Sequence, residues 1–222
     1  MRPVLKGICH LLNSLKAQLN DSLKEQQAMY RDIWTWEKCK GKITTLRGRL
    51  GFSDKPALGF LKLTLSLETG DIRDEIRDKS LLEIAPSVYC ILSGYADSEP
   101  TPETGKLISY SQLPGGRSYY NAFVRRAAQP IERTFGSDPQ SLWKAARVLD
   151  GEKLDFGDCS VKIRSLPLVP IVVILHGDTS EFQASANMLF DSSASNFGST
   201  EQLAMLGELT SARLRQAFEA IA

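Results

Sequence analysis

The sequence lacks the closely spaced cysteines of a metal or iron–sulfur centre. Its four cysteines are separated by 30, 51 and 69 residues, so it contains no C-x-x-C pair: Cys9, Cys39, Cys90 and Cys159. A zinc ribbon and a four-cysteine iron–sulfur motif are therefore not supported. Because widely scattered cysteines are typical of reduced thiols, we expect a cytoplasmic protein.

The sequence also lacks a long hydrophobic run. Its longest nearly apolar stretch, residues 166–175, is ten residues long and contains two prolines. A membrane-spanning helix needs about 20 apolar residues. Lys6, His10 and Asn13 interrupt the apolar start of the chain, and no clear cleavage site follows. We therefore expect neither a membrane span nor a signal peptide.

A serine hydrolase motif is absent as well. No G-x-S-x-G sequence occurs, and only His10 and His176 could act as a histidine base. No Walker A motif follows the single Gly-Gly pair at Gly115 and Gly116. The sequence therefore supports neither a serine hydrolase with a G-x-S-x-G motif nor a nucleotide hydrolase with a Walker A motif.

The composition is that of a globular protein with an uneven charge. The chain has 222 residues, of which 42% are hydrophobic and 24% charged. Residues 1–55 hold 11 Lys+Arg against 5 Asp+Glu, a net charge of +6, whereas residues 56–222 hold 16 against 21, a net charge of −5. The basic end could bind an acidic partner or form a solvated helix face. Since few aromatics accompany this charge, we expect no nucleic-acid partner.

The hydrophobic pattern predicts an α+β fold. Apolar residues at helical spacing predict a basic amphipathic helix over residues 1–29, ahead of a single α+β domain over residues 30–222. That helix either packs on the domain or serves as a partner surface. Strands are expected near residues 42–52, 60–68, 159–165 and 171–175, in one mostly antiparallel sheet covered by helices.

Caps and prolines position the helices of this expected fold. Ser80 with Glu83 predicts a capping box before a helix that reaches Tyr95, and Ser199 with Gln202 predicts another before the last helix. Two further helices are expected over residues 118–134, bent by Pro130, and 138–149. Residues 97–106 have the composition of a surface loop.

The first candidate site follows the strand that ends near residue 175. His176, Asp178, Glu181 and Asp191 lie within sixteen residues, and one nitrogen with several oxygens could bind a metal ion. Their spacing matches no standard metal motif. The alternative is structural, with Asp178 and Asp191 capping turns, and we favour it.

The second candidate site is the turn before the helix at residue 118. Gly115 and Gly116 could present backbone N–H groups to a ligand anion, with Arg117 adding charge and Tyr119 adjacent. The alternative is a plain turn and helix cap. The ligand-binding candidates are therefore Gly115, Gly116, Arg117, Tyr119, Asp178, Glu181 and Asp191.

Five short motifs occur in an order that resembles a known family: LPGG…YYNAF, GD…LPLVP, HGD…EF, LFDSSAS and TEQLAMLG. The chain resembles domain of unknown function family number 3786 from about residue 30 to residue 218. Residues that match the family pattern include Gly116, Tyr119, Phe123, Asp158, Pro167, Pro170, Gly177, Asp178, Glu181, Phe182, Phe190, Asp191 and Glu201. His176 departs from it, because the family has a tryptophan at that place.

The resemblance implies an uncharacterised protein of anaerobic bacteria or archaea. Some family members carry, or lie near, an iron–sulfur domain of the kind found in corrinoid proteins. This chain lacks that cysteine-rich module, so an iron–sulfur or corrinoid protein would be a separate partner. The expected function is that of a non-enzymatic cofactor- or partner-binding protein, with a corrinoid or another tetrapyrrole as a candidate ligand. The alternative is a metal-dependent enzyme, such as a hydrolase, that uses His176, Asp178, Glu181 and Asp191.

Overall fold

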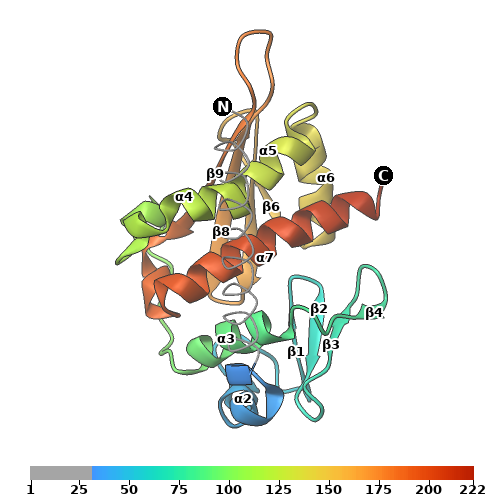
Figure 1. Cartoon of the computed structure of the whole chain (residues 1–222), viewed down its shortest axis with the longest axis vertical. Coiled ribbons are helices and arrows are strands. Elements are labelled where there is room, and N and C mark those ends of the chain that lie inside the picture. The colour runs from blue at the N-terminus through green and yellow to red at the C-terminus, as the bar shows by residue number, and fades with distance from the viewer. Residues whose placement is uncertain (1–31) are drawn as a thin grey trace, which may run out of the picture.

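A computed structural model describes residues 32–222, which form two antiparallel sheets with helices between and over them (Figure 1). The helix expected over residues 1–29 lies outside the described residues. The α-helices are α2 (Trp36–Ile43), α3 (Ala85–Ala96), α4 (Tyr120–Phe123), α5 (Gln129–Phe135), α6 (Gln140–Val148) and α7 (Thr200–Glu219). Shorter helical turns are η1 (Thr44–Leu46), η2 (Tyr110–Gln112), η3 (Gly116–Ser118), the π-helical turn η4 (Val124–Ala128) and η5 (Ser192–Asn196).

The smaller sheet is an antiparallel meander of four short strands. Its order is β1 (Ala57–Phe60), β2 (Leu63–Ser66), β3 (Ile72–Asp74) and β4 (Lys79–Ser80). Alternate side chains point into the core, where Leu63 and Leu65 are fully buried. Tyr89 of α3 donates a hydrogen bond of 2.7 Å to the carbonyl of Gly70, which fixes this sheet to α3.

One predicted strand in this region is wrong, and another is too long. Residues 42–52 form the end of α2, η1 and a series of turns, because Gly48, Leu50 and Gly51 have positive φ angles that a strand does not accommodate. The strand predicted over residues 60–68 is confirmed only as β2, because the chain turns at Leu61 and Lys62, with φ of 50° and 55°, and β2 pairs back with β1. The single sheet that was predicted is consequently two sheets.

The larger sheet has five antiparallel strands. Its order is β5 (Leu107–Ser109), β9 (Ser185–Asp191), β8 (Val169–His176), β7 (Cys159–Leu166) and β6 (Glu152–Leu154). The predicted strands at 159–165 and 171–175 are confirmed as β7 and β8. The α+β class with antiparallel pairing is confirmed too. Helices α5, α6 and α7 contact this sheet and lie over one of its faces (Figure 1).

Helix α7 begins at the predicted capping box and lies between the two sheets (Figure 1). The Ser199 hydroxyl accepts a hydrogen bond from the N–H of Gln202, and the Gln202 side chain accepts one from the N–H of Ser199. The other predicted box is wrong, because Ser80 lies in β4 and α3 starts at Ala85. Because the capping box fixes the first residue of α7, it also fixes where each later side chain lies along the helix.

A buried polar side chain of α3 joins the segment before β1 to the larger sheet. Tyr95 of α3 donates a hydrogen bond of 2.8 Å to the carbonyl of Leu50 and accepts one of 3.1 Å from the N–H of Leu168, in the turn between β7 and β8. Burial raises the pKa of Tyr95 to about 12, so it stays a donor at neutral pH. The buried apolar side chains around both sheets form one continuous cluster.

Candidate functional site

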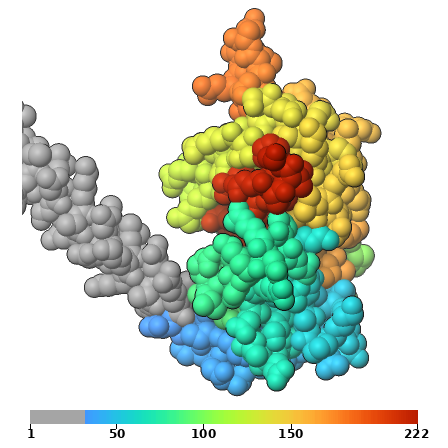
Figure 2. All heavy atoms as spheres, turned by 90° about the vertical axis from the view of Figure 1, so that its right-hand side faces the viewer, coloured from blue at the N-terminus to red at the C-terminus, as the bar shows by residue number. Residues whose placement is uncertain are grey.

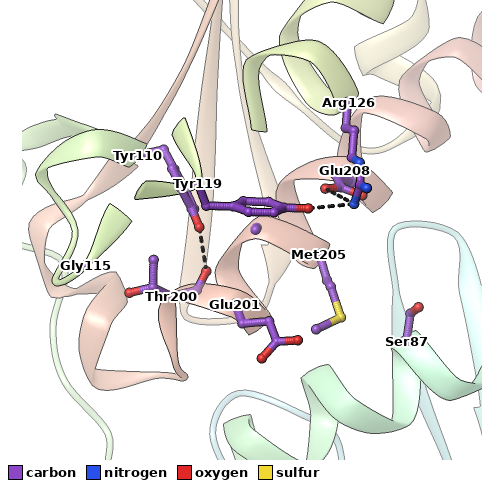
Figure 3. A pocket seen from close by; sticks show the side chains of 10 residues that line it. Ser87, Tyr110, Gly115, Tyr119, Arg126, Thr200, Glu201, Met205 and Glu208 are labelled. Atoms are coloured by element: carbon purple, nitrogen blue, oxygen red, sulfur yellow. Dashed lines mark hydrogen bonds and ion pairs between the residues drawn. The ribbon is translucent and has the colours of Figure 1, made fainter. Parts of the chain in front are cut away.

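A cavity of about 570 Å³ opens beside the N-terminal half of α7 (Figure 3). Its walls come from α3, the turn before η3, the helical segment that follows, and α7. The lining residues are Ser87, Tyr110, Gly115, Tyr119, Arg126, Thr200, Glu201, Ala204, Met205 and Glu208. The volume lies within the range of about 300–1,000 Å³ that is usual for small-molecule sites.

One face of α7 forms the longest wall of the cavity. Glu201, Ala204, Met205 and Glu208 are spaced at i, i+3, i+4 and i+7, which places them on the same side of a helix. The carboxylates stand at the two ends of this wall, and the alanine and methionine lie between them. The capping box at Ser199 sets where the wall begins.

The Gly115–Gly116 turn is shaped by steric demands. Gly115 has φ of +75°, in the left-handed region, and a Cβ on Gly116 would come within 2.0 Å of the Tyr110 carbonyl oxygen. The N–H of Gly116 donates to the carbonyl of Leu113 at 2.9 Å. Glycine at both positions therefore allows the chain to double back and deliver Tyr119 to the cavity.

Two hydrogen bonds tie this turn to the start of α7. The Tyr110 hydroxyl donates to the carbonyl of Thr200 at 3.2 Å, and the Thr200 hydroxyl donates to the carbonyl of Pro114 at 2.6 Å. Behind them, the Tyr110 ring stacks on Phe123 with centroids 4.3 Å apart. Gly207 makes room for this stack, since a Cβ there would lie 2.6 Å from the Phe123 ring.

Helix α3 approaches α7 closely on the other side of the cavity. A Cβ on Gly94 would lie 2.2 Å from the side-chain oxygen of Gln202. The Gln202 amide instead donates a hydrogen bond of 2.9 Å to the carbonyl of Cys90. This contact places Ser87, one turn further back on α3, across the cavity from Tyr119 (Figure 3).

Tyr119, Arg126 and Glu208 form a polar group at one end of the cavity. Nη1 of Arg126 donates a hydrogen bond of 2.6 Å to the Tyr119 hydroxyl and lies 3.8 Å from the Glu208 carboxylate. Arg126 belongs to η4, the π-helical turn that interrupts the predicted helix over residues 118–134 just before Pro130. π-Helical turns are rare and often occur at functional sites.

Burial changes the acidity of these groups. It raises the pKa of Glu208, and the nearby Arg126 only partly opposes this. Burial, together with the charge of Glu208, also raises the pKa of Tyr119. Burial raises the pKa of Tyr110 to about 12. Both phenols therefore keep their protons at neutral pH and can donate hydrogen bonds.

The two predicted sites fare differently in the structure. Gly115 and Tyr119 line the cavity, Gly116 shapes its turn, and the Arg117 side chain is exposed and does not line it. His176 pairs with Ser185 at one end of the β8–β9 ladder, whereas Asp191 follows Phe190, the partner of Ile171, at the other end. Ser185 and Asp191 are six residue steps apart along β9, or about 20 Å.

The predicted metal site does not form. Asp178 accepts a hydrogen bond of 2.7 Å from the N–H of Ala184, and Glu181 is exposed in the tight turn between Thr179 and Phe182. These residues belong to residues 177–184, which stand out from the body of the molecule (Figure 2, orange). Nowhere in residues 32–222 do three or more His, Cys, Asp or Glu side chains gather in a way that could hold a metal ion.

Asp191 is a buried structural clamp. One carboxylate oxygen accepts hydrogen bonds from the N–H and hydroxyl of Ser193 and of Thr104, and the other accepts one from the N–H of Gly105. Burial works against ionisation, but the hydrogen bonds from Ser193 and Thr104 outweigh it and lower the pKa of Asp191. Residues 97–106 are thus anchored to the end of β9 and the start of η5.

A comparison with family models identifies the chain. The model described as "Domain of unknown function (DUF3786)" matches residues 51–213. The chain belongs to this family. The resemblance noted in the motifs is therefore confirmed, and the match includes every residue that lines the cavity. Neither a curated protein nor a solved structure matches the chain.

Membership in the DUF3786 family assigns no activity, so a function can be inferred only from the cavity and the residues that line it. Within residues 32–222, no helix combines the length and apolar character needed to cross a bilayer. In the part of the chain that the structure describes, the side chains of Cys39, Cys90 and Cys159 are buried.

Eight of the ten residues that line the cavity were not among the predicted site residues, among them Arg126, Met205 and Glu208. Arg126 comes from η4, whereas Met205 and Glu208 come from α7, far along the chain from the Gly115–Gly116 turn. A sequence signal for the α7 wall was available, because Glu201 and Glu208 are seven residues apart and enclose Ala204 and Met205. Glu201 stood in the family pattern, but its partners could be found only once α7 was placed against the turn.

Proposed function

We propose that this protein is a non-enzymatic binding protein that holds a small organic ligand in the cavity beside α7. The observation that carries the proposal is the lining itself. An exposed Tyr119 ring, the Met205 thioether and a few polar groups surround a space of about 570 Å³. Small-molecule sites combine apolar and aromatic walls with a small number of placed polar groups in this way.

The chemistry of the lining favours binding over catalysis. Among residues 32–222, those that line the cavity include no histidine, cysteine or lysine. The Thr200 hydroxyl donates to the Pro114 carbonyl. A histidine or cysteine paired with a nucleophile, as acyl transfer commonly uses, is thus not offered by these side chains. Arg126, Glu208 and the phenols can orient a ligand through hydrogen bonds.

The family resemblance supplies narrower candidates for the ligand and the partner. A corrinoid or another tetrapyrrole is one candidate ligand. Among the lining side chains, Met205 has the sulfur that could approach the metal ion at the centre of such a ring. An iron–sulfur or corrinoid protein of anaerobic metabolism is the corresponding candidate partner. Absorbance titrations with cobalamin and haem test this version, which fails if neither spectrum changes on adding the protein. A cytoplasmic location stays a prediction.

A fragment screen tests the wider proposal. Ligand-observed nuclear magnetic resonance with a mixed library of small organic compounds would be run on the full chain and on Ser87→Trp. Ser87 is half-buried on the α3 side of the cavity, so an indole there should fill the space. Glu83→Trp is the matched control, because Glu83 is exposed just before α3 and does not line the cavity.

The proposal predicts fragments that bind the wild-type protein and Glu83→Trp but not Ser87→Trp. Loss of binding only in Ser87→Trp would locate the ligand in the cavity. Fragments that bind all three proteins equally would place the binding elsewhere on the chain. A library that yields no binder to the wild-type protein would contradict the proposal directly.

A further inference from the structure

We propose that the ligand of this cavity carries a protonated amine at one end, a hydrogen-bond acceptor at the other, and an apolar middle. The inference rests on the proposed binding function and goes further by naming the ligand's chemical class. It comes from the order of side chains along α7 and from the groups that face them.

The amine end is set by Glu201. Its side chain is exposed at the cavity, and no ion-pair partner for it occurs among residues 32–222, whereas Glu208 has Arg126 nearby. Figure 3 shows the Glu201 carboxylate on the same side of α7 as Met205. A ligand cation at this end would gain a charge-assisted hydrogen bond to a carboxylate that has no competing cation.

The middle of the site is apolar. Ala204 and Met205 form the α7 wall between the two glutamates, and the Tyr119 ring lies across from them with 36% of its surface exposed. A thioether and an aromatic face attract flat or aliphatic carbon groups. Polar atoms of a ligand in this stretch would find few partners, so its central part should be carbon.

The acceptor end is set by Tyr119 and Arg126. The Tyr119 oxygen accepts its hydrogen bond from Arg126, which leaves the phenol proton for another acceptor. Arg126 is exposed, and guanidinium has five N–H donors, of which the Tyr119 contact uses one. A carbonyl, carboxylate or phosphate oxygen would satisfy these donors. Glu208, at 3.8 Å from Arg126, lies too far to hydrogen-bond with it.

The spacing of the two ends fixes the ligand's shape. Glu201 and Glu208 are seven residues apart on α7, which is about 10 Å along the helix axis. The acceptor end lies beside Glu208 because Arg126 does. An elongated molecule fits this arrangement better than a compact one, and a polar group at each end would fix its direction.

Three closely matched probes test the inference by calorimetry with the full chain. Para-aminomethylbenzoate has the amine, the flat apolar middle and the carboxylate. Para-hydroxymethylbenzoate replaces the amine by a neutral hydroxyl, and para-methylbenzylamine lacks the carboxylate. We expect the first to bind about tenfold more tightly than either of the others, which is the discrimination that one charge-assisted hydrogen bond gives.

Glu201→Gln should remove the preference for the amine. It should weaken para-aminomethylbenzoate binding about tenfold and change para-hydroxymethylbenzoate binding by less than about twofold. Glu201 also lies in the first turn of α7, where a carboxylate favours the helix dipole, so selectivity between probes is the readout rather than stability. Glu219→Gln, at the far end of α7 and outside the cavity, should leave all three affinities unchanged.

The outcomes separate this inference from the function it rests on. If the hydroxyl probe binds as tightly as the amine, or if no probe binds while fragments bind in the cavity, the ligand class is wrong and the binding function stands. If neither the probes nor any fragment binds, both are wrong. An amine preference that survives Glu201→Gln would overturn the assignment of the amine to that carboxylate.

Discussion

The Tyr119 hydroxyl accepts a hydrogen bond of 2.6 Å from Nη1 of Arg126, and the guanidinium carbon lies 5.8 Å from the centre of the Tyr119 ring. The contact joins a residue delivered by the Gly115–Gly116 turn to one delivered by the π-helical turn η4. Both residues line the cavity, so this hydrogen bond fixes one of its walls.

Gly116→Ala should destabilise the protein by about 3 kcal/mol, the upper end of the usual cost of forced overpacking. The new Cβ would lie 2.0 Å from the Tyr110 carbonyl oxygen, which is backbone and cannot rotate away. Urea denaturation measures the loss. Gly41→Ala is the control, because nothing lies within 4 Å of its Cβ in α2, and it should stabilise the protein by about 0.5–1 kcal/mol. Similar effects from both variants would rule out the close approach at Gly116.

Arg213→Met should cost about 3–5 kcal/mol in the free energy of unfolding, as expected for a broken buried ion pair. Arg213 is 1% exposed and donates to the Leu61 and Lys62 carbonyls and to Asp74, whose carboxylate would be left buried and unpaired. Replacing Asp74 by leucine in the same chain should recover part of this loss, which chemical denaturation of both variants would show.

The control for Arg213 is a surface ion pair. Arg47→Met removes the exposed pair between Arg47 and Asp54 and should cost less than about 1 kcal/mol. A loss in Arg213→Met no larger than in Arg47→Met would mean that the link between α7 and the smaller sheet contributes little to stability.

Asp191→Asn should lower stability by about 1–3 kcal/mol at pH 7, since hydrogen bonds to a buried carboxylate are stronger than those to an amide. The pKa of Asp191 is lower in the folded protein than in the unfolded chain. Its contribution is thus complete above the ordinary aspartate pKa of about 3.9 and is lost as the pH falls below it.

Denaturation of Asp191→Asn and wild type at pH 7, 5 and 3 checks both the size and the sign. The difference in unfolding free energy should be constant from pH 7 to pH 5 and smaller at pH 3, reflecting the pKa of about 3.9 in the unfolded chain. A difference that grows on acidification would contradict the role given to the Ser193 and Thr104 hydrogen bonds. Asp178→Asn, in the exposed loop, should cost less than about 1 kcal/mol throughout.

Glu208→Gln should leave the protein as stable as wild type at neutral pH or slightly more stable, by less than about 1 kcal/mol. Burial raises the pKa of Glu208, so ionisation of this carboxyl disfavours the folded state. The penalty is absent below the unfolded pKa of about 4.3 and is reached as the pH rises through the folded value. Thermal denaturation at several pH values should show the two proteins converging in acid. A variant less stable than wild type at pH 7 would mean that attraction to Arg126 outweighs burial.

Local patterns predicted those parts of the fold that local chemistry determines. Alternating side chains predicted β7, the apolar run predicted β8, and the Ser199–Gln202 pair predicted the start of α7. The pattern predicted one strand over residues 60–68 because apolar and polar residues continue to alternate through the turn at Leu61 and Lys62. Arg213, about 150 residues away, donates to both carbonyls of that turn, and no local signal shows this.

The missed strand β9 has a similar explanation. It contains no valine, isoleucine or threonine, and it gains its place by pairing with β8 and β5. For the site, the glycine turn was visible because it demands particular residues, whereas Arg126 and Glu208 become neighbours only through the packing of η4 on α7. Asp191 is close in sequence to Asp178 and Glu181, but the length of β9 separates it from their loop.

Ligand binding in the cavity beside α7 is tested by mapping a bound fragment through backbone amide chemical shifts in the isotope-labelled full chain. Binding in this cavity predicts shifts concentrated in residues 110–126 and 200–208, which surround it, and no shifts in Ser87→Trp. Shifts concentrated in residues 176–185, or shifts that persist unchanged in Ser87→Trp, would contradict it.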